Sequence, residues 1–387
     1  LPLGISFFTF QQLSFLIDRC KGKAPHYTLL DYMSFVTFFP SLISGPIVLH
    51  ASTVEQFQDP SRRKFDAESF AKGVAQFTVG LGKKVLLADT LALAVNYGYD
   101  NISLLDTPSA LIVALSYTLE LYFDFSGYSD MAIGLGQMLG FNFNKNFDYP
   151  YISTSVSEFW RRWHMSLGAW MKDYVFYPFS LAKGVRRIGK AARRRFGRHL
   201  GSTLPIALGN LLVFFLVGLW HGASWNYIVW GLFYGILIAM SALLKPSFDK
   251  LRDLLHIPAH SRVFMLFQIF RTFVLTCAGC VIFRAATLSD AAGIFSGMFS
   301  GSFLSDAWKS ELLSFGLDKW NWGVMLGSLL VLLIVDLMQE KGSVREWRDR
   351  RSAPLRWSVC AAGCLMLILF AVYGPGTNPV QFVYMQY

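Results

Sequence analysis

Residues 204–221 read LPIALGNLLVFFLVGLWH, and residues 225–244 read WNYIVWGLFYGILIAMSALL. Each stretch is apolar and, as an α-helix, long enough to cross about 30 Å of hydrocarbon. The sequence therefore predicts an all-α, polytopic transmembrane protein. Comparable apolar stretches recur near residues 3–17, 31–49, 69–97, 108–123, 126–141, 262–285, 318–338 and 355–373.

The composition excludes an ordinary soluble globular protein. Of the 387 residues, 53% are hydrophobic and only 16% are charged, whereas a typical soluble domain carries about 25% charged residues. The formal net charge is +10, and most of this excess lies in one short stretch. Eight basic residues with no acidic residue among them make up this stretch: Lys183, Arg186, Arg187, Lys190, Arg193, Arg194, Arg195 and Arg198.

The basic stretch at 183–199 is predicted to be a cytoplasmic loop. Short loops rich in Lys and Arg beside apolar helices stay on the cytoplasmic side and attract anionic headgroups of membrane lipids. A second basic stretch at 341–356 lies on the same side if the four intervening apolar stretches all cross the membrane. Because the charge is local, we expect no nucleic-acid binding. Docking of an acidic carrier or partner protein on this loop is an open alternative.

Residues 1–387 are expected to form one membrane domain that lacks its amino-terminal helices. Leu1 already stands at the edge of an apolar segment, and no basic region precedes that segment as in a signal peptide. The five cysteines have neither the spacing of a zinc site nor that of a disulfide framework. We therefore expect no metal site.

The first polar cluster inside an apolar stretch is ELYFDFSGYSD at 120–130. Glu120 and Asp124 are one helical turn apart and share a face if the helix is unbroken. Gly127 fits either a broken or a tightly packed helix. The two carboxylates are candidates for a polar brace with Arg161 or Arg162 as counter-charge, or for direct contact with substrate.

The second cluster is the Trp-rich segment EFWRRWHMSLGAWMKDY at 158–174. Its aromatic residues recur at helical spacing, which predicts an amphipathic helix that is interfacial or re-entrant. In one interpretation this helix only anchors the chain in the membrane interface. In the other, Arg161 and Arg162 face a phosphate group and His164 faces a cavity.

The third cluster is GLWHGASWN at 218–226, between two apolar stretches that together are too long for one span. A turn must fall here, so His221 lies at irregular backbone, which membrane proteins tolerate against protein or a water-lined cavity. Imidazole has an ordinary pKa near 6.5 and can accept a hydroxyl proton at neutral pH. The sequence leaves open whether His221 is catalytic or structural. It contains no G-x-S-x-G or H-E-x-x-H motif.

Small and polar residues around this turn give two further expectations. Glycines spaced four apart let neighbouring helices approach closely, and they stand at Gly218, Gly222, Gly231 and Gly235. In a regular helix Asn210 lies on the same stripe as His221.

At these clusters the chain resembles the membrane-bound O-acyltransferase family, and within it the bacterial branch that acetylates alginate. The resemblance covers nearly the whole chain. It is carried by PLGISFFTFQ from Pro2, FFPSLISGPI from Phe38, YFDFSGYSDMAIG from Tyr122, SEFWRRWHMSLGAWMKDYVFYP from Ser157, LWHGASWNYIVWG from Leu219 and IFRAATLSDA from Ile282.

The resemblance implies a fold of many tilted helices around a central tunnel, with His221 as the essential histidine and His164 as the second. It implies transfer of an acyl group from a cytoplasmic thioester, such as acetyl-CoA, to a hydroxyl of an extracellular polysaccharide, with no bound cofactor. It also implies a multi-pass protein of the bacterial cytoplasmic membrane that works with a periplasmic or extracellular acetyltransferase partner.

In this scheme His221 is the general base. Asn210, Ser224 and Asn226 are candidates to orient its imidazole or polarise the carbonyl, and Arg161 and Arg162 are candidates to hold donor phosphates. Two other functions stay open. One is D-alanyl transfer to teichoic acid from a carrier protein, and the other is proton-coupled transport.

Overall fold

The computed structural model describes residues 4–43, 45–258, 261–301, 315–341, 350–370 and 382. Helices and the turns between them make up these ranges, which contain no β-strand. The all-α class predicted from the sequence is therefore confirmed for the described part of the chain. The chain divides into two compact units, one of Leu1–Phe57 with Asn144–Ala291 and one of Gln58–Phe143 with Ala292–Gln386.

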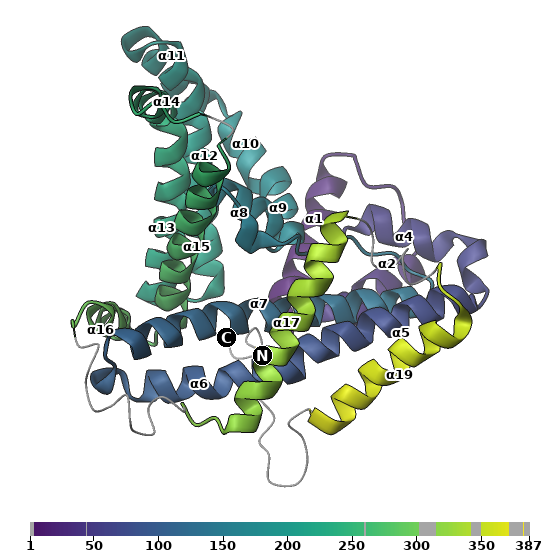
Figure 1. The fold of residues 1–387 in the computed structure, drawn as a ribbon. Coiled ribbons are helices and arrows are strands. Elements are labelled where there is room, and N and C mark those ends of the chain that lie inside the picture. Colours follow the sequence, from purple (N-terminus) through teal and green to yellow (C-terminus); the bar gives the residue numbers. More distant parts are fainter. Residues whose placement is uncertain are drawn as a thin grey trace. The chain divides into compact units, whose positions relative to one another are not determined.

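The helices of the first unit come from both of its segments (Figure 1). They are α1 (Ile5–Cys20), α2 (Leu29–Val36), α3 (Phe39–Leu42), α4 (His50–Gln58), η4 (Pro150–Ile152), α8 (Val156–Arg162), α9 (Met165–Met171), η5 (Lys172–Phe176), α10 (Tyr177–Ser180), α11 (Lys183–Phe196), α12 (Arg198–His221), α13 (Trp225–Leu243), α14 (Lys245–Leu254) and α15 (Arg262–Arg284). The next helix, α16 (Leu288–Met298), begins in this unit and ends in the second.

The remaining helices belong to the second unit. They are η1 (Pro60–Arg63), α5 (Ala67–Gly82), η2 (Lys83–Ala88), α6 (Asp89–Asp100), η3 (Ile102–Leu104), α7 (Thr107–Met138), α17 (Lys319–Lys341) and α19 (Ala353–Phe370). Half of the second basic stretch of the sequence, 341–356, lies outside the described residues, because 342–349 are not among them.

Three described helices are long and apolar enough to cross a membrane: α12, α13 and α15. They pack lengthwise in the first unit, with α13 against both of the others. α12 and α13 meet at the turn that the sequence predicts between its two longest apolar stretches. This hairpin carries His221.

Two predicted apolar segments, 108–123 and 126–141, are not separate. They form the single helix α7, Thr107–Met138. Gly127 does not break the helix but allows a neighbour to come close, since a Cβ there would lie 2.8 Å from the carbonyl oxygen of Gly80 on α5. Of the two alternatives at Gly127, the tightly packed helix is the one observed.

The Trp-rich segment also differs from the continuous helix suggested by its spacing. α8 ends at Arg162 and α9 begins at Met165. Between them His164 has φ 46° and ψ 52°, a left-handed conformation that a right-handed helix cannot contain. The break therefore falls at one of the two candidate histidines.

The basic stretch at 183–199 is mostly helical. Its residues form α11, which packs against α12 through a narrow stripe of Val185, Gly189 and Ala192. All eight basic side chains are exposed. The stretch is thus an ordered surface helix joined to α12 at Gly197.

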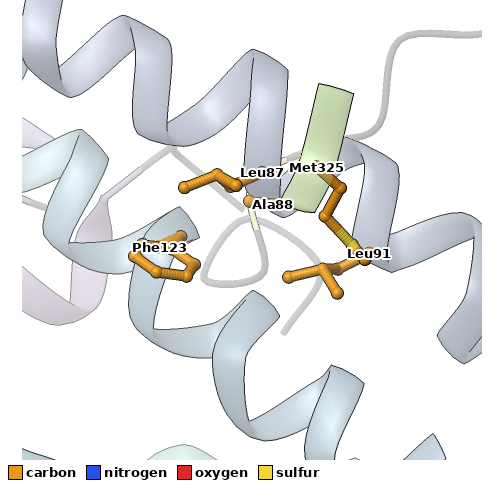
Figure 2. Close-up of a cluster of buried hydrophobic side chains, with 5 residues drawn as sticks. All are labelled: Leu87, Ala88, Leu91, Phe123 and Met325. Carbon is orange, nitrogen blue, oxygen red and sulfur yellow. The ribbon is translucent and has the colours of Figure 1, made fainter. Parts of the chain in front are cut away.

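A cluster of buried apolar side chains holds part of the second unit together (Figure 2). It joins η2 and α6 to α7 and α17 and consists of Leu87, Ala88, Leu91, Phe123 and Met325. Each of these side chains is less than 9% exposed. The cluster fixes α7, and with it Glu120 and Asp124, against its neighbours.

Candidate active site

His221 is the last residue of α12, where the backbone turns toward α13. Its side chain is buried, and rings from three helices surround it. The ring centroid of His221 lies 4.6 Å from Trp220, 5.1 Å from Trp230 on α13 and 5.0 Å from Phe283 on α15. These contacts hold the imidazole inside the protein at a helix end.

α12 and α13 approach each other closely beside His221. A Cβ at Gly218 would overlap the carbonyl oxygen of Tyr227, and a Cβ at Gly231 would overlap that of Phe214. Any larger residue would push the two helices apart. The close approach predicted from these two glycines is confirmed.

His164 is held in its left-handed conformation by one asparagine. The Oδ1 atom of Asn146 lies 3.3 Å from His164 Nδ1 and accepts hydrogen bonds from Ser166 N at 3.1 Å and Ser166 Oγ at 2.9 Å. Because the backbone N–H of Ser166 needs an acceptor, the Asn146 atom is its carbonyl oxygen. His164 Nδ1 must then carry the hydrogen, which leaves the lone pair on Nε2.

One phenylalanine of α1 connects the two histidines. The Phe7 ring lies 6.1 Å from the His164 ring and 5.7 Å from the ring of Trp220, the residue before His221. His221 is also close enough to His164 to act on it electrostatically. The first unit thus brings together the two candidate histidines from segments separated along the chain.

The two candidate arginines differ in their surroundings. Arg162 donates to Glu158 Oε1 from Nη2 at 2.8 Å and from Nε at 3.1 Å, and to the carbonyl oxygen of Asp148 at 3.3 Å. Burial raises the pKa of Glu158, but hydrogen bonds from Thr154 and Arg162 outweigh this effect and lower it below its ordinary value. Arg162 therefore braces α8, whereas Arg161 is exposed.

The three polar candidates near His221 occupy different places. Asn226 is buried at the start of α13 and donates from Nδ2 to the carbonyl oxygen of Ala285 at 2.8 Å, which ties α13 to the end of α15. Ser224 is the exposed N-cap residue of α13. Asn210 is half-buried on α12, on the helical stripe that leads to His221. Their proposed roles at the imidazole stay predictions.

Glu120 and Asp124 belong to the second unit, where both are buried on α7. Asp124 Oδ1 lies 2.7 Å from Lys84 Nζ, and the same ammonium group lies 2.8 Å from Asp89 Oδ1. The observed counter-charge of Asp124 is thus a lysine of η2, not an arginine of the Trp-rich segment. In the same way Lys83 pairs with Asp130 at 2.7 Å. Lys83 and Lys84 interrupt the apolar stretch 69–97 in the sequence, and each forms an ion pair with an acid of α7.

A polar network at the far end of α1 was not found from the sequence. Asp18 Oδ2 accepts a hydrogen bond from Tyr174 Oη at 2.7 Å and lies 3.2 Å from His50 Nε2. Burial and this carboxylate raise the pKa of Tyr174 above its ordinary value, so the phenol stays protonated and donates. The network anchors η5, which follows α9, to α1. Like Asn146, its members are far apart in sequence and follow no periodic pattern.

Comparison with known proteins gives consistent relationships. Residues 8–192 match the sequence model of the membrane-bound O-acyltransferase family. The chain is 39% identical over 341 residues to the probable alginate O-acetylase AlgI of Pseudomonas aeruginosa, an alignment that covers 88% of this chain and 59% of that protein.

Two further relatives extend the comparison. The AlgI protein of Azotobacter vinelandii is 39% identical over 317 residues, covering 81% of this chain and 57% of the relative. The peptidoglycan O-acetyltransferase of Helicobacter pylori is 30% identical, covering 100% of this chain and 75% of the relative. The chain therefore spans somewhat more than half the length of the two alginate acetylases.

Proposed function

The chain belongs to the membrane-bound O-acyltransferase family, and from this premise we propose that it transfers an acetyl group from a thioester to a hydroxyl of an extracellular polysaccharide. Relatives named for the O-acetylation of alginate and of peptidoglycan support acetyl as the acyl group and a polysaccharide as the acceptor. We place the protein in the bacterial cytoplasmic membrane as a multi-pass protein.

The observation that carries the proposal is the setting of His221. The imidazole stands at the end of a candidate membrane helix, is buried, and has a second histidine nearby. Ionisable groups at such positions are costly, and they often mark functional sites. A buried base beside a helix break supports catalysis inside the protein, in the tunnel that the family resemblance implies.

In the proposed reaction His221 is the general base. Its imidazole removes the proton of the acceptor hydroxyl while the hydroxyl oxygen attacks the carbonyl carbon of the thioester. The C–S bond then breaks, and the departing sulfur takes the proton from the imidazolium, so the products are an ester and a free thiol. General-base catalysis of this kind contributes roughly 10²- to 10⁴-fold in rate. The Nε2 lone pair of His164 is suited to orienting the hydroxyl.

The donor and the partner follow from the same scheme. A cytoplasmic thioester such as acetyl-CoA supplies the acyl group, and no resident cofactor takes part. Arg161, which is exposed, is better placed than Arg162 to bind a phosphate of the donor, because Arg162 already binds Glu158. A periplasmic or extracellular acetyltransferase is the proposed partner in modifying the polysaccharide.

The test is the ester content of the cell-surface polysaccharide in cells that carry the full-length gene. His221→Ala should abolish O-acetylation while the amount of protein in the membrane stays normal. The matched control is His26→Ala, since His26 is an exposed histidine that contacts Arg19. This control should acetylate at the wild-type rate.

Each alternative function predicts another result. Loss of D-alanyl ester with unchanged acetyl ester would assign the chain to teichoic-acid D-alanylation. No change in any ester in either the His221→Ala variant or a deletion strain would overturn acyl transfer and favour a transporter. Normal acetylation by His221→Ala alone would disprove the role of this histidine as base.

A further inference from the structure

The buried face of α1 packs against Trp220, the residue before His221, and its Phe7 ring lies 6.1 Å from the His164 ring. Phe7, Phe10, Gln11 and Ser14 make up this face. The Trp220 ring packs against it, with its centroid 5.7 Å from Phe7 and 5.3 Å from Phe10. Gln11 follows Phe10 and lies one turn beyond Phe7, on the same side of the helix. The first turns of α1 therefore reach the residue next to His221.

Two hydrogen-bond donors at the contact of α1 with Trp220 have no protein acceptor. Gln11 is 1% exposed, and among the described residues neither its Nε2 atom nor Trp220 Nε1 has a hydrogen-bond partner. The neighbouring indole of Trp170 differs, since its Nε1 donates to the carbonyl oxygen of Phe10 at 3.0 Å. The fold thus satisfies one indole at this face and leaves the other available. Buried donors are nearly always paired, so two such donors, one on Trp220 beside His221 and one on the α1 face that packs against Trp220, indicate an acceptor supplied by a ligand.

The chemistry of the two groups restricts that ligand atom. An indole N–H can only donate, and so can the NH₂ group of glutamine. The matching atom is an oxygen with lone pairs, and a carbonyl oxygen accepts two such bonds. It accepts them most strongly when it gains negative charge, as it does when a hydroxyl attacks the carbonyl carbon.

We propose that Gln11 Nε2 and Trp220 Nε1 form an oxyanion-binding pair that donates to the carbonyl oxygen of the acyl group being transferred. This inference rests on the proposed acyl transfer and names two further catalytic residues for it. As the acceptor oxygen bonds to the carbonyl carbon, the electrons of the C=O double bond move to its oxygen, where both donors stabilise the charge. The electrons return to re-form the C=O double bond when the C–S bond breaks. Both donors keep their hydrogens throughout.

The first test removes each donor with little change in shape. Gln11→Leu deletes the carboxamide, and Trp220→Phe deletes the N–H but keeps an aromatic ring. In cells with the full-length gene, each should slow acetyl-ester formation about 100-fold, the usual effect of losing one oxyanion-hole donor. The thermal midpoint of the purified Gln11→Leu protein should be unchanged or higher, because a buried donor without an acceptor is replaced by an apolar group. Trp220→Phe should lower the midpoint moderately, because the smaller ring fills less of the space between Phe7, Phe10 and His221.

The matched control is Gln12→Leu, the same change one residue along α1. The Nε2 atom of Gln12 also has no partner among the described residues, but its Oε1 atom accepts a hydrogen bond from Tyr32 Oη, so this side chain is directed to α2. The control should acetylate within two-fold of wild type. Wild-type rates in both Gln11→Leu and Trp220→Phe would overturn the proposal, and so would an equal loss in Gln12→Leu or a loss in Gln11→Leu that parallels a fall in its thermal midpoint.

A second measurement identifies the atom that the donors bind. With the carbonyl of acetyl-CoA labelled with ¹³C, two hydrogen bonds should lower its infrared stretching frequency on binding to the inactive His221→Ala protein. The shift should shrink when Gln11→Leu or Trp220→Phe is added. A shift that neither change alters, or no shift at all, would assign the donors to another group, such as an acceptor sugar hydroxyl, and overturn the proposal.

His221→Ala separates this inference from the function on which it rests. If that variant and a deletion strain both acetylate normally, the proposed function fails. If the variant is inactive while Gln11→Leu and Trp220→Phe are both fully active, acyl transfer stands and only the oxyanion-binding pair is wrong.

Discussion

Backbone strain and side-chain hydrogen bonding coincide at His164. A left-handed conformation is uncommon for a residue other than glycine and costs of order 1–3 kcal/mol, so the surrounding structure must enforce it. Asn146 does so by binding the His164 ring, the Ser166 backbone and the Ser166 hydroxyl through one oxygen atom. The left-handed conformation directs the His164 imidazole toward Asn146, a direction that a continuous helix would not give it.

Replacing this clamp tests its importance. Asn146→Ala leaves the N–H and hydroxyl of Ser166 without an acceptor, and we expect a loss of about 1–3 kcal/mol in the free energy of unfolding. Misplacement of His164 should slow acetyl-ester formation roughly 10- to 100-fold. Both are measurable on the full-length protein by thermal unfolding and by ester content. Asn144→Ala, at an exposed position, is the control, and an equal effect there would contradict the clamp.

Lys84 is the second residue whose surroundings give a sharp prediction. It is 5% exposed and bridges the carboxylates of Asp124 and Asp89. Lys84→Met removes this cation from the buried Asp124 and the partly buried Asp89, and removing one partner of a buried ion pair typically costs about 3–5 kcal/mol. We expect the unfolding midpoint to fall steeply.

The control for Lys84→Met is the same substitution in an ion pair on the surface. Lys72 pairs with Glu68 on α5, and both side chains are substantially exposed. Lys72→Met should therefore change stability by less than about 1 kcal/mol. Equal stabilities of Lys84→Met and Lys72→Met would show that the buried network does not hold α7 to η2.

At the scale of elements, small residues determine which helices can touch. α5 and α7 meet where Gly80 faces Gly127, and α12 and α13 meet where Gly218 and Gly231 face backbone. α11 and α12 follow the same rule, since a Cβ at Gly189 would lie 2.8 Å from Pro205 Cγ and 2.9 Å from the carbonyl oxygen of Gly201. Between membrane helices, packing of this kind replaces much of the hydrophobic driving force.

Two glycines of α11 offer a matched test of this packing. Gly189→Leu would overpack the contact with α12 and should destabilise the protein by about 1–3 kcal/mol. At Gly184 nothing lies within 4 Å of the position that a Cβ would take, so Gly184→Leu should not destabilise the protein, and the higher helix propensity of leucine should stabilise it by up to about 1 kcal/mol. Thermal unfolding of the two variants checks this. Equal midpoints would mean that α11 is not packed on α12.

At the scale of the whole molecule, the apolar helices and the strongest concentration of positive charge lie in neighbouring segments. Three helices have the length and hydropathy to cross a membrane, and the largest excess of positive charge lies on α11, next in the chain to the first of them. A helix with exposed basic residues beside a span matches the positive-inside bias and the attraction of anionic lipids. The same charges suit an acidic carrier protein.

Neutralising part of α11 separates these two roles. With Arg186, Arg187, Arg194 and Arg195 all changed to Gln, we expect acetyl-ester formation within about two-fold of wild type, because surface charges of this kind serve orientation and lipid contact. Ester content per molecule of membrane-inserted protein is the measurement. A selective loss of acetylation with normal insertion would indicate docking of an acidic donor carrier instead.

The sequence by itself determined whatever depends on neighbouring residues. Apolar stretches of about 20 residues specify membrane helices because the bilayer has a fixed thickness. The turn at 218–226 follows because two such stretches are too long for one span. Hence the all-α class, the α12–α13 hairpin and the position of His221 at the turn of this hairpin were all predictable.

Only the tertiary structure decided which distant residues meet. The break at His164, the clamp by Asn146, the pairing of Lys84 with Asp124 and the buried donors Gln11 and Trp220 each depend on segments far apart in the chain. Periodicity reports only the face of a helix on which a residue lies, not the partner that faces it. Hydrogen bonds and ion pairs require matching atoms at about 3 Å, and that distance is set by packing.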